Sequence, residues 1–270
     1  MGLFGPKLPI DRDEFDWQLA CFKWMIEEFE DLERHRAAPL VTPTVDFFPD
    51  SAVAGHARAA ELFDQVRMHA GLEQVHFRLE AGAENRPHRV QSGLGLVHDG
   101  NAPLGTYRVE DRGGGVYEPV ITYNPSLLDN PAGLVGTFAH EFAHYIVDGA
   151  RRLPPGGHDL HEHATDLAAV FIGFGIFLAN GAKNFQSHQS FDEMSWSSSR
   201  SGYLSEAALV TGLAISEGLA GRDPLAAGQW LKPHLASDLK RAAIYLAKRH
   251  PDIAADVAAI DLTDYGLQPI

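Results

Sequence analysis

Two histidines and a glutamate lie close together in the segment His140-Glu141-Phe142-Ala143-His144, which has the pattern HExxH. A helix turns about 400° over four residues, so both imidazoles emerge from one face, one turn apart. Two nitrogens at this spacing can bind one Zn²⁺ at roughly 2.0–2.1 Å. Glu141 stands beside them and can reach a metal-bound water, which predicts a general base. Composition alone produces the motif only about 0.04 times in such a chain, which argues against coincidence.

A catalytic zinc ion needs a third protein ligand and one open position. One continuation of HExxH requires Gly and His where this chain has Val147 and Ala150, and is therefore excluded. Another places a Glu on the following helix with an Asp four residues later. Glu162 and Asp166 fit it, beginning 18 residues after His144. We expect Glu162 to bind the metal and Asp166 to accept a hydrogen bond from the far nitrogen of a ligand histidine.

Other side chains near Glu162 are alternative ligands. Asp148 follows the second histidine by one turn, at a helix end where the dipole disfavours a carboxylate. The three histidines closest to Glu162 are also candidates, although such histidines are more often loop or surface residues and Glu162 is preferred; they are His158, His161 and His163.

Helix signals surround both parts of this pattern. Asn130 can cap a helix that has Pro131 at its first position and stops at Gly149. A loop rich in Pro and Gly follows over 151–157. A second helix is expected from about 159 to 180, ending at Gly181. The two helices would carry the histidines and the glutamate respectively.

With these residues in place, the sequence resembles the gluzincins, a group of zinc peptidases that includes thermolysin-like enzymes. The resemblance covers about Asn124 to Asn180. It implies Glu162 as the third zinc ligand and Asp166 as the hydrogen-bond partner of His140. The stretch 165–177 and the later Gly202-Tyr-Leu-Ser-Glu206 also resemble a bacterial group of zincin-like proteins, and this likeness gives no substrate.

The expected reaction is metal-assisted hydrolysis of a peptide bond. Glu141 would take the proton of the water and pass it to the leaving amine. A second group usually stabilises the oxyanion, and Tyr203 and His188 are candidates. Packing as an ordinary core aromatic is an equally good interpretation of Tyr203. By analogy with zincins, the strand expected at 116–123 would line the cleft as an edge strand.

The remaining signals predict an α+β fold that is mainly helical and zincin-like, with a small, mostly antiparallel sheet. Three sequence regions, 1–123, 124–182 and 183–270, are expected to form one compact domain. A loop is expected over 186–202, and the turn Asp99-Gly100-Asn101 predicts a hairpin. Helices are expected at about 12–37, 52–70 and within 205–260, and strands at 75–79, 94–98, 104–109 and 116–123.

Bulk composition narrows the function classes. The net charge of −14 over 270 residues disfavours nucleic acid and anionic membranes as partners. The one cysteine, Cys21, excludes a thiolate-built zinc finger within the chain. No signal-peptide pattern is visible, and the most apolar run, 167–179, is too short to span a membrane, so a cytoplasmic location is expected.

Three function classes follow from these observations. The first is a zinc peptidase acting on a peptide or protein substrate. The second is a non-catalytic or regulatory zinc protein, against which the intact Glu141 argues, because a structural site does not need a base. The third is a hydrolase of another bond, such as an ester or a cell-wall amide.

Overall fold

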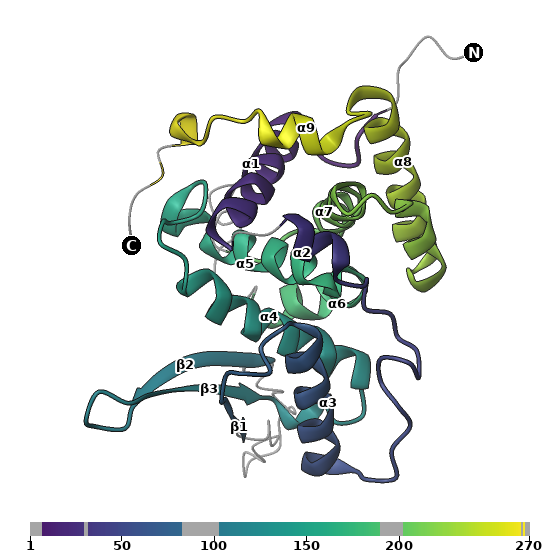
Figure 1. Ribbon diagram of the computed structural model, residues 1–270. Coiled ribbons are helices and arrows are strands. Elements are labelled where there is room, and N and C mark those ends of the chain that lie inside the picture. Colours follow the sequence, from purple (N-terminus) through teal and green to yellow (C-terminus); the bar gives the residue numbers. More distant parts are fainter. Residues whose placement is uncertain (1–6, 30–31, 83–102, 190–201, 266, 268–270) are drawn as a thin grey trace, which may run out of the picture.

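The computed structural model describes residues 7–29, 32–82, 103–189, 202–265 and 267 (Figure 1). These residues form an α+β fold that is mainly helical, as the sequence predicts. The strands are β1 (Arg78–Ala81), β2 (Gly105–Asp111) and β3 (Tyr117–Tyr123). The α-helices are α1 (Arg12–Glu28), α2 (Leu32–Ala37), α3 (Gly55–His69), α4 (Pro131–Asp148), α5 (His161–Ala169), α6 (Gly175–Gln189), α7 (Glu206–Leu219), α8 (Pro233–Arg249) and α9 (Ile253–Ala258).

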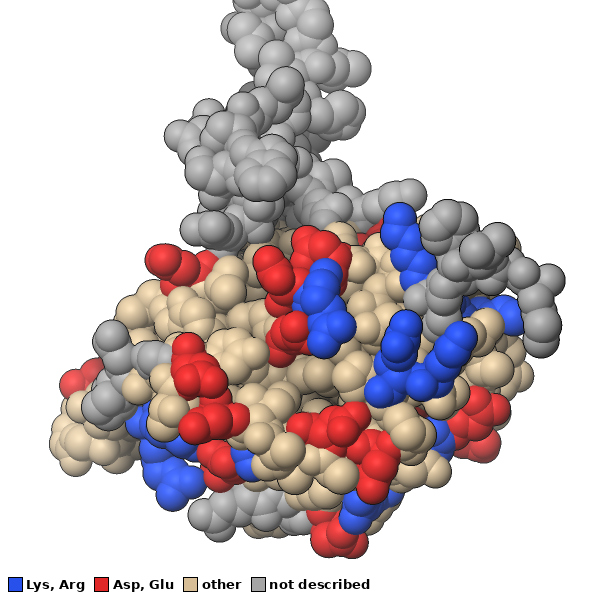
Figure 2. Space-filling view, turned by 90° about the horizontal axis from the view of Figure 1, so that it is seen from above, with Lys and Arg blue, Asp and Glu red and all other residues tan. Residues whose placement is uncertain are grey.

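The molecule has a sheet end and a helical end, with α4 crossing between them (Figure 1). The sheet and α3 lie on one side of α4, and α5, α6 and α7 lie on the other. Helices α1, α8 and α9 complete the helical end. The face that α1, α8 and α9 present in Figure 2 carries acidic and basic side chains interspersed, so the negative net charge is not gathered there as one patch.

The first helix follows directly from its sequence. The Asp11 side chain accepts a hydrogen bond from the Glu14 amide, which caps α1, and Phe15, Leu19 and Phe22 bury one stripe in the core. The single helix expected over 12–37 is instead divided, because α1 ends at Glu28 and α2 begins at Leu32.

The sheet corrects one expectation, the edge position of the strand at 116–123. Its strand order is β1-β3-β2, with β1 parallel and β2 antiparallel to β3, so the small sheet is mixed and most of its paired residues are antiparallel, as predicted. The strand predicted at 116–123 is the central strand, and β2 is the edge strand beside α4. The β2–β3 hairpin is local, closed by three glycines of positive φ, Gly113 to Gly115. The parallel pairing of β1 is long-range, which no local pattern reveals. The strand predicted at 94–98 lies outside the described residues.

The helix that carries Glu162 is kinked. A π-helical turn, Val170–Phe174, joins α5 to α6, and Gly173 within it has φ of 100°. A Cβ on this glycine would lie 2.8 Å from the Pro39 carbonyl oxygen, and the Val41 amide donates to the Gly173 carbonyl at 3.0 Å. A glycine is required because the chain crosses at this point. Gly181 does not end the helix as predicted, since α6 continues to Gln189, into the predicted loop.

One stretch of described helix, Gly157–Ala182, is long and apolar enough to cross a membrane. This helix is longer than the 13-residue apolar run that the sequence singles out. The rest of the fold encloses 83% of its most apolar window, which is the pattern of a core helix.

Candidate metal centre

The two histidines of the HExxH motif emerge from α4 toward α5. Asn130 caps α4 by accepting a hydrogen bond from the Gly133 amide, and Pro131 occupies its first turn. The rings of His140 and His144 lie 4.7 Å apart between centroids, nearly perpendicular to each other. Their side chains are 2% and 17% exposed respectively, so the pair is reached from the His144 side.

Glu162 closes this pair from the first turn of α5. Its Oε2 atom lies 3.5 Å from the Nε2 atom of His140 and 3.5 Å from that of His144. These separations are longer than the usual 2.9 Å or so of an N–H···O hydrogen bond. They match the roughly 3.4 Å between ligand atoms bound tetrahedrally at about 2.1 Å. One ligand atom from each of these residues lies within 4.8 Å of the other two, so the three could hold a metal ion. We call His140, His144 and Glu162 the donor group.

Asp166 orients the more buried histidine. Its Oδ1 atom lies 2.9 Å from the Nδ1 atom of His140, and its Oδ2 atom accepts a hydrogen bond from the Leu204 amide at 2.7 Å. With the Nδ1 proton donated to Asp166, Nε2 of His140 faces His144 and Glu162, and it would bind a metal ion there on losing its own proton. Asp166 is itself 1% exposed, so both bonds are shielded from water.

The histidines and the glutamate of the donor group shift one another's pKa values. Burial acts to lower the pKa of His140, but Asp166 and Glu162 outweigh it and raise the pKa to about 10. Burial likewise opposes ionisation of Glu162, whereas His140 and His144 hold its pKa well below the usual range. The carboxylate form of Glu162, which a metal ion requires, is therefore strongly favoured.

Glu141 lies beside the donor group without belonging to it. It is 4% exposed, and burial raises the pKa of its carboxyl, while the two neighbouring histidines act in the opposite direction. Strand β2 approaches it closely at Gly105. A Cβ there would lie 2.6 Å from Oε1 of Glu141 and 2.5 Å from Cγ2 of Thr137, so only glycine allows the strand to pack so near.

Tyr203 reaches the same centre from the segment before α7. Its ring centroid is 4.9 Å from that of His140. Burial raises the pKa of its hydroxyl far above the usual value, and Glu141, Asp166 and Glu162 act in the same direction. The hydroxyl is thus a neutral hydrogen-bond donor. The adjacent Leu204 amide, bound to Asp166, fixes this segment.

The alternative ligands take other positions. His161 pairs with Asp148, with 3.1 Å between Nε2 and Oδ1, and its ring lies nearly parallel to that of His144, with centroids 6.0 Å apart. His163 packs edge-on against Trp17 of α1, and His158 is exposed. His188, predicted as an oxyanion group, falls outside the part of α6 whose side chains the structure describes.

Sequence reasoning missed three contributors to this centre. The Tyr107 ring of β2 lies parallel to that of His144, with centroids 6.3 Å apart. Gly105 and the Leu204 amide are the other two. A glycine opening a strand was the one available signal, since it often marks a close approach of the backbone. The backbone amide leaves no trace in a sequence pattern.

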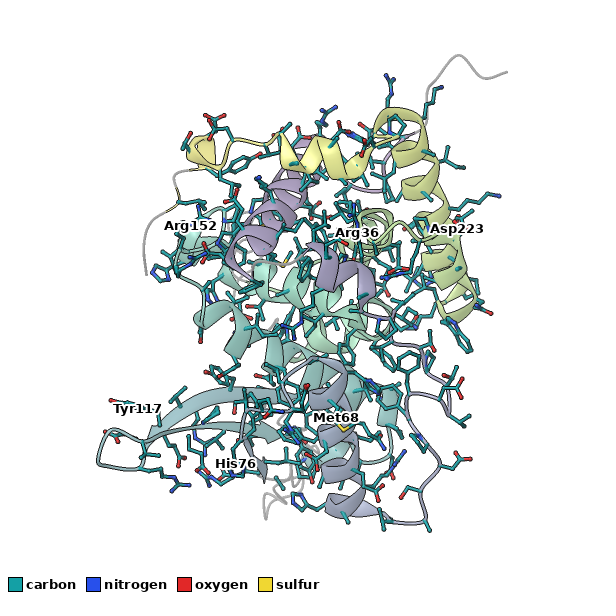
Figure 3. The ribbon with its side chains drawn as sticks, viewed as in Figure 1. Arg36, Met68, His76, Tyr117, Arg152 and Asp223 are labelled. Carbon is teal, nitrogen blue, oxygen red and sulfur yellow. The ribbon has the colours of Figure 1, made fainter. Side chains whose placement is uncertain are left out.

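Helix α1 holds the loop that joins the two ligand helices. The indole N–H of Trp24 donates to the Arg152 carbonyl at 3.1 Å, and that of Trp17 donates to the Pro155 carbonyl at 2.8 Å. The guanidinium of Arg152, which is labelled in Figure 3, also pairs with Glu28, at 2.6 Å between Nε and Oε1. These bonds fix the direction in which the chain enters α5, and hence the position of Glu162.

No protein-family model, curated protein or solved structure matches this chain. The chemistry of the centre therefore rests on its own residues and their geometry.

Proposed function

We propose that the chain is a zinc-dependent peptidase, related to the gluzincins, in which His140, His144 and Glu162 hold the metal. The observation that carries this proposal is the spacing of the three donor atoms, at 3.5 Å from Glu162 to each imidazole. Two imidazoles and one carboxylate form a ligand set typical of catalytic zinc.

Two further features support catalysis over a structural role. Structural zinc sites are usually closed by four protein ligands, whereas the group found among the described residues has three. The Glu162 side chain is also 36% exposed, so the centre is open to solvent on one side. A non-catalytic or regulatory zinc protein, the alternative, requires neither the open position nor the buried Glu141.

The residues divide the work as follows. A bound zinc ion would act as a Lewis acid, polarising the peptide carbonyl and lowering the pKa of water. The Glu141 carboxylate accepts a proton from the attacking water and gives it to the nitrogen of the leaving amine. The Tyr203 hydroxyl donates a hydrogen bond to the oxygen that gains negative charge. Asp166 keeps the Nδ1 proton of His140 in place throughout.

Metal analysis combined with a peptide-cleavage assay tests this proposal. The purified protein should contain about one zinc ion per chain and cleave a mixture of unstructured peptides. A chelator should abolish cleavage, and added zinc should restore it. Stoichiometric zinc without cleavage of any peptide would support the regulatory alternative instead, and absence of any divalent metal affinity would overturn both.

A further inference from the structure

The β2–β3 hairpin has one face that, Asp111 apart, remains apolar after the hairpin leaves the body of the protein. Cross-strand partners share a face, and the pairs here are Tyr107 with Ile121, Val109 with Pro119, and Asp111 with Tyr117. Ile121 is buried against the core, but Val109 is 51% exposed and Tyr117 is 66% exposed. Tyr117 lies near the far end of the hairpin, which projects from the fold (Figures 1 and 3). We call Tyr107, Val109 and Tyr117 the hairpin shelf.

The opposite face of the same hairpin is polar and pairs its own charges. Arg78 of β1 contacts Glu118 of β3 at 3.0 Å, and Arg108 of β2 contacts Glu80 at 2.6 Å and Glu110 at 2.9 Å. This is the face that water is expected to cover. Exposure of large apolar side chains on the other face therefore needs a separate explanation.

The hairpin shelf begins at the metal centre. The Tyr107 ring lies parallel to His144, and Gly105, two residues earlier on β2, contacts Glu141. Within the described sheet, β2 pairs with β3 alone, so it is an edge strand. An extended peptide lying along such an edge passes from the metal centre directly onto the hairpin shelf.

We propose that the hairpin shelf binds the bulky apolar or aromatic side chains of an extended peptide substrate; this rests on the proposed function. A strand rises about 3.4 Å per residue, so Val109 lies about 7 Å beyond Tyr107, and Tyr117, level with Asp111, about 14 Å. The shelf therefore selects apolar residues two and four positions from the peptide residue beside Tyr107. Acidic peptides are disfavoured, because Asp111, Asp148 and the overall charge of −14 repel them.

A binding experiment tests the shelf without requiring hydrolysis. Zinc-loaded Glu141→Gln protein is used to select binders from a random peptide library, alongside the same protein with Val109→Ser and Tyr117→Ser added. We expect binders of the first protein to be enriched in pairs of bulky apolar residues separated by one residue, and depleted in Asp and Glu. The added substitutions should remove the apolar enrichment. No enrichment, or enrichment that survives the substitutions, would overturn the proposal.

Cleavage-site mapping provides the second arm. With the Glu141 side chain intact, Val109→Ser should lower kcat/KM at least tenfold for peptides that carry a bulky apolar residue at the selected position, compared with the same peptides carrying serine there. Ile244→Ser, which removes a similarly exposed apolar side chain on α8, is the matched control. It should leave kcat/KM unchanged for both the apolar and the serine peptides. Absence of cleavage combined with shelf-dependent binding would refute the peptidase but not the shelf.

Self-association is the competing explanation of an exposed apolar face. Sedimentation velocity of the wild-type protein and of the Val109→Ser, Tyr117→Ser double variant distinguishes the two. We expect the same sedimentation coefficient for both proteins. A wild-type dimer that the double variant dissociates would assign the shelf to a second copy of the chain and overturn the substrate proposal.

Discussion

At the residue scale, Glu141 is buried beside the three candidate metal ligands but is not one of them. It lies between the donor group and strand β2, buried, with its carboxyl pKa raised chiefly by that burial. A raised pKa makes the carboxylate a stronger base, as a group that accepts a proton from water requires. Its value to the protein is therefore expected to be chemical rather than structural.

Replacing Glu141 with Gln tests this role. The amide has nearly the same shape but cannot carry the proton, so turnover should fall about 100- to 10,000-fold. Zinc content, measured by elemental analysis, should stay at the wild-type level because Glu141 is outside the donor group. Glu33→Gln, on an exposed side chain of α2, serves as control. Wild-type turnover in Glu141→Gln protein would remove this residue from the mechanism.

Asp166 accepts hydrogen bonds from His140 and from the Leu204 amide, so its removal should lower the affinity for zinc. Asp166→Ala should weaken zinc binding about 10- to 100-fold, as expected for a hydrogen-bond partner of a ligand histidine. Asp166→Asn should lose less, since the amide oxygen still accepts one of the two bonds. Competition with a chromophoric chelator measures the affinities. Asp159→Ala, on an exposed residue before α5, should bind zinc normally; equal affinities for all variants would contradict the assigned role.

At the element scale, the existence of the helix pair could be predicted from the sequence because its capping and spacing signals are local, whereas the kink at Gly173 depends on a distant segment. The Asn130 cap, Pro131 and the HExxH spacing define α4 to the residue, and Glu162 and Asp166 share one face of α5. The sheet could not be predicted as well. Its central strand is chosen by the parallel pairing of Arg78 to Ala81 with β3, which depends on residues far apart in the chain.

Gly105 shows how an element's position controls the site. In Gly105→Ala the added Cβ would overlap the side chains of Thr137 and Glu141, so either these side chains must shift or β2 must move away from α4. We expect a loss of about 1–3 kcal/mol in the free energy of unfolding. Turnover should also fall while zinc content is retained, because the three donor residues are not touched. Urea unfolding, elemental analysis and the cleavage assay provide the measurements.

The control for this substitution is Gly228→Ala. A Cβ at Gly228 would meet its nearest neighbours only at 3.8 Å, an ordinary contact distance. Gly228→Ala should therefore leave both stability and turnover close to wild type. If Gly105→Ala behaved like this control, the close approach of β2 to Glu141 would matter neither for stability nor for turnover.

At the scale of the whole molecule, His35 joins α2 to α7 and to the π-helical turn. Its ring nitrogens lie 3.0 Å from the carbonyl oxygens of Phe171 and Ser216, and the ring stacks on Phe171. Burial lowers the pKa of His35 below its usual 6.5, opposed by the two carbonyls; Arg222 acts with burial and Glu217 against it.

This lowered pKa gives a pH dependence of stability. The unfolded chain binds the proton of His35 more readily than the folded one. The stability that His35 contributes is thus present above about pH 6.5 and lost as the pH falls through the lowered value. Metal-free wild-type protein should lose more in Tm between pH 8 and pH 5 than metal-free His35→Gln protein. The same loss of Tm in both proteins would contradict this assignment.

The crossing of Pro39–Val41 over Gly173 has a consequence for protein engineering. Because the N-terminal segment is hydrogen-bonded into the kink of the helix that presents Glu162, the two ligand helices cannot be excised as a portable module. A fragment that starts after Val41 would leave the bent turn without the segment that crosses it, and one that stops before Leu204 would remove the backbone amide that donates to Asp166. Transplanting this centre into another scaffold would require carrying nearly the full span from α1 to α7.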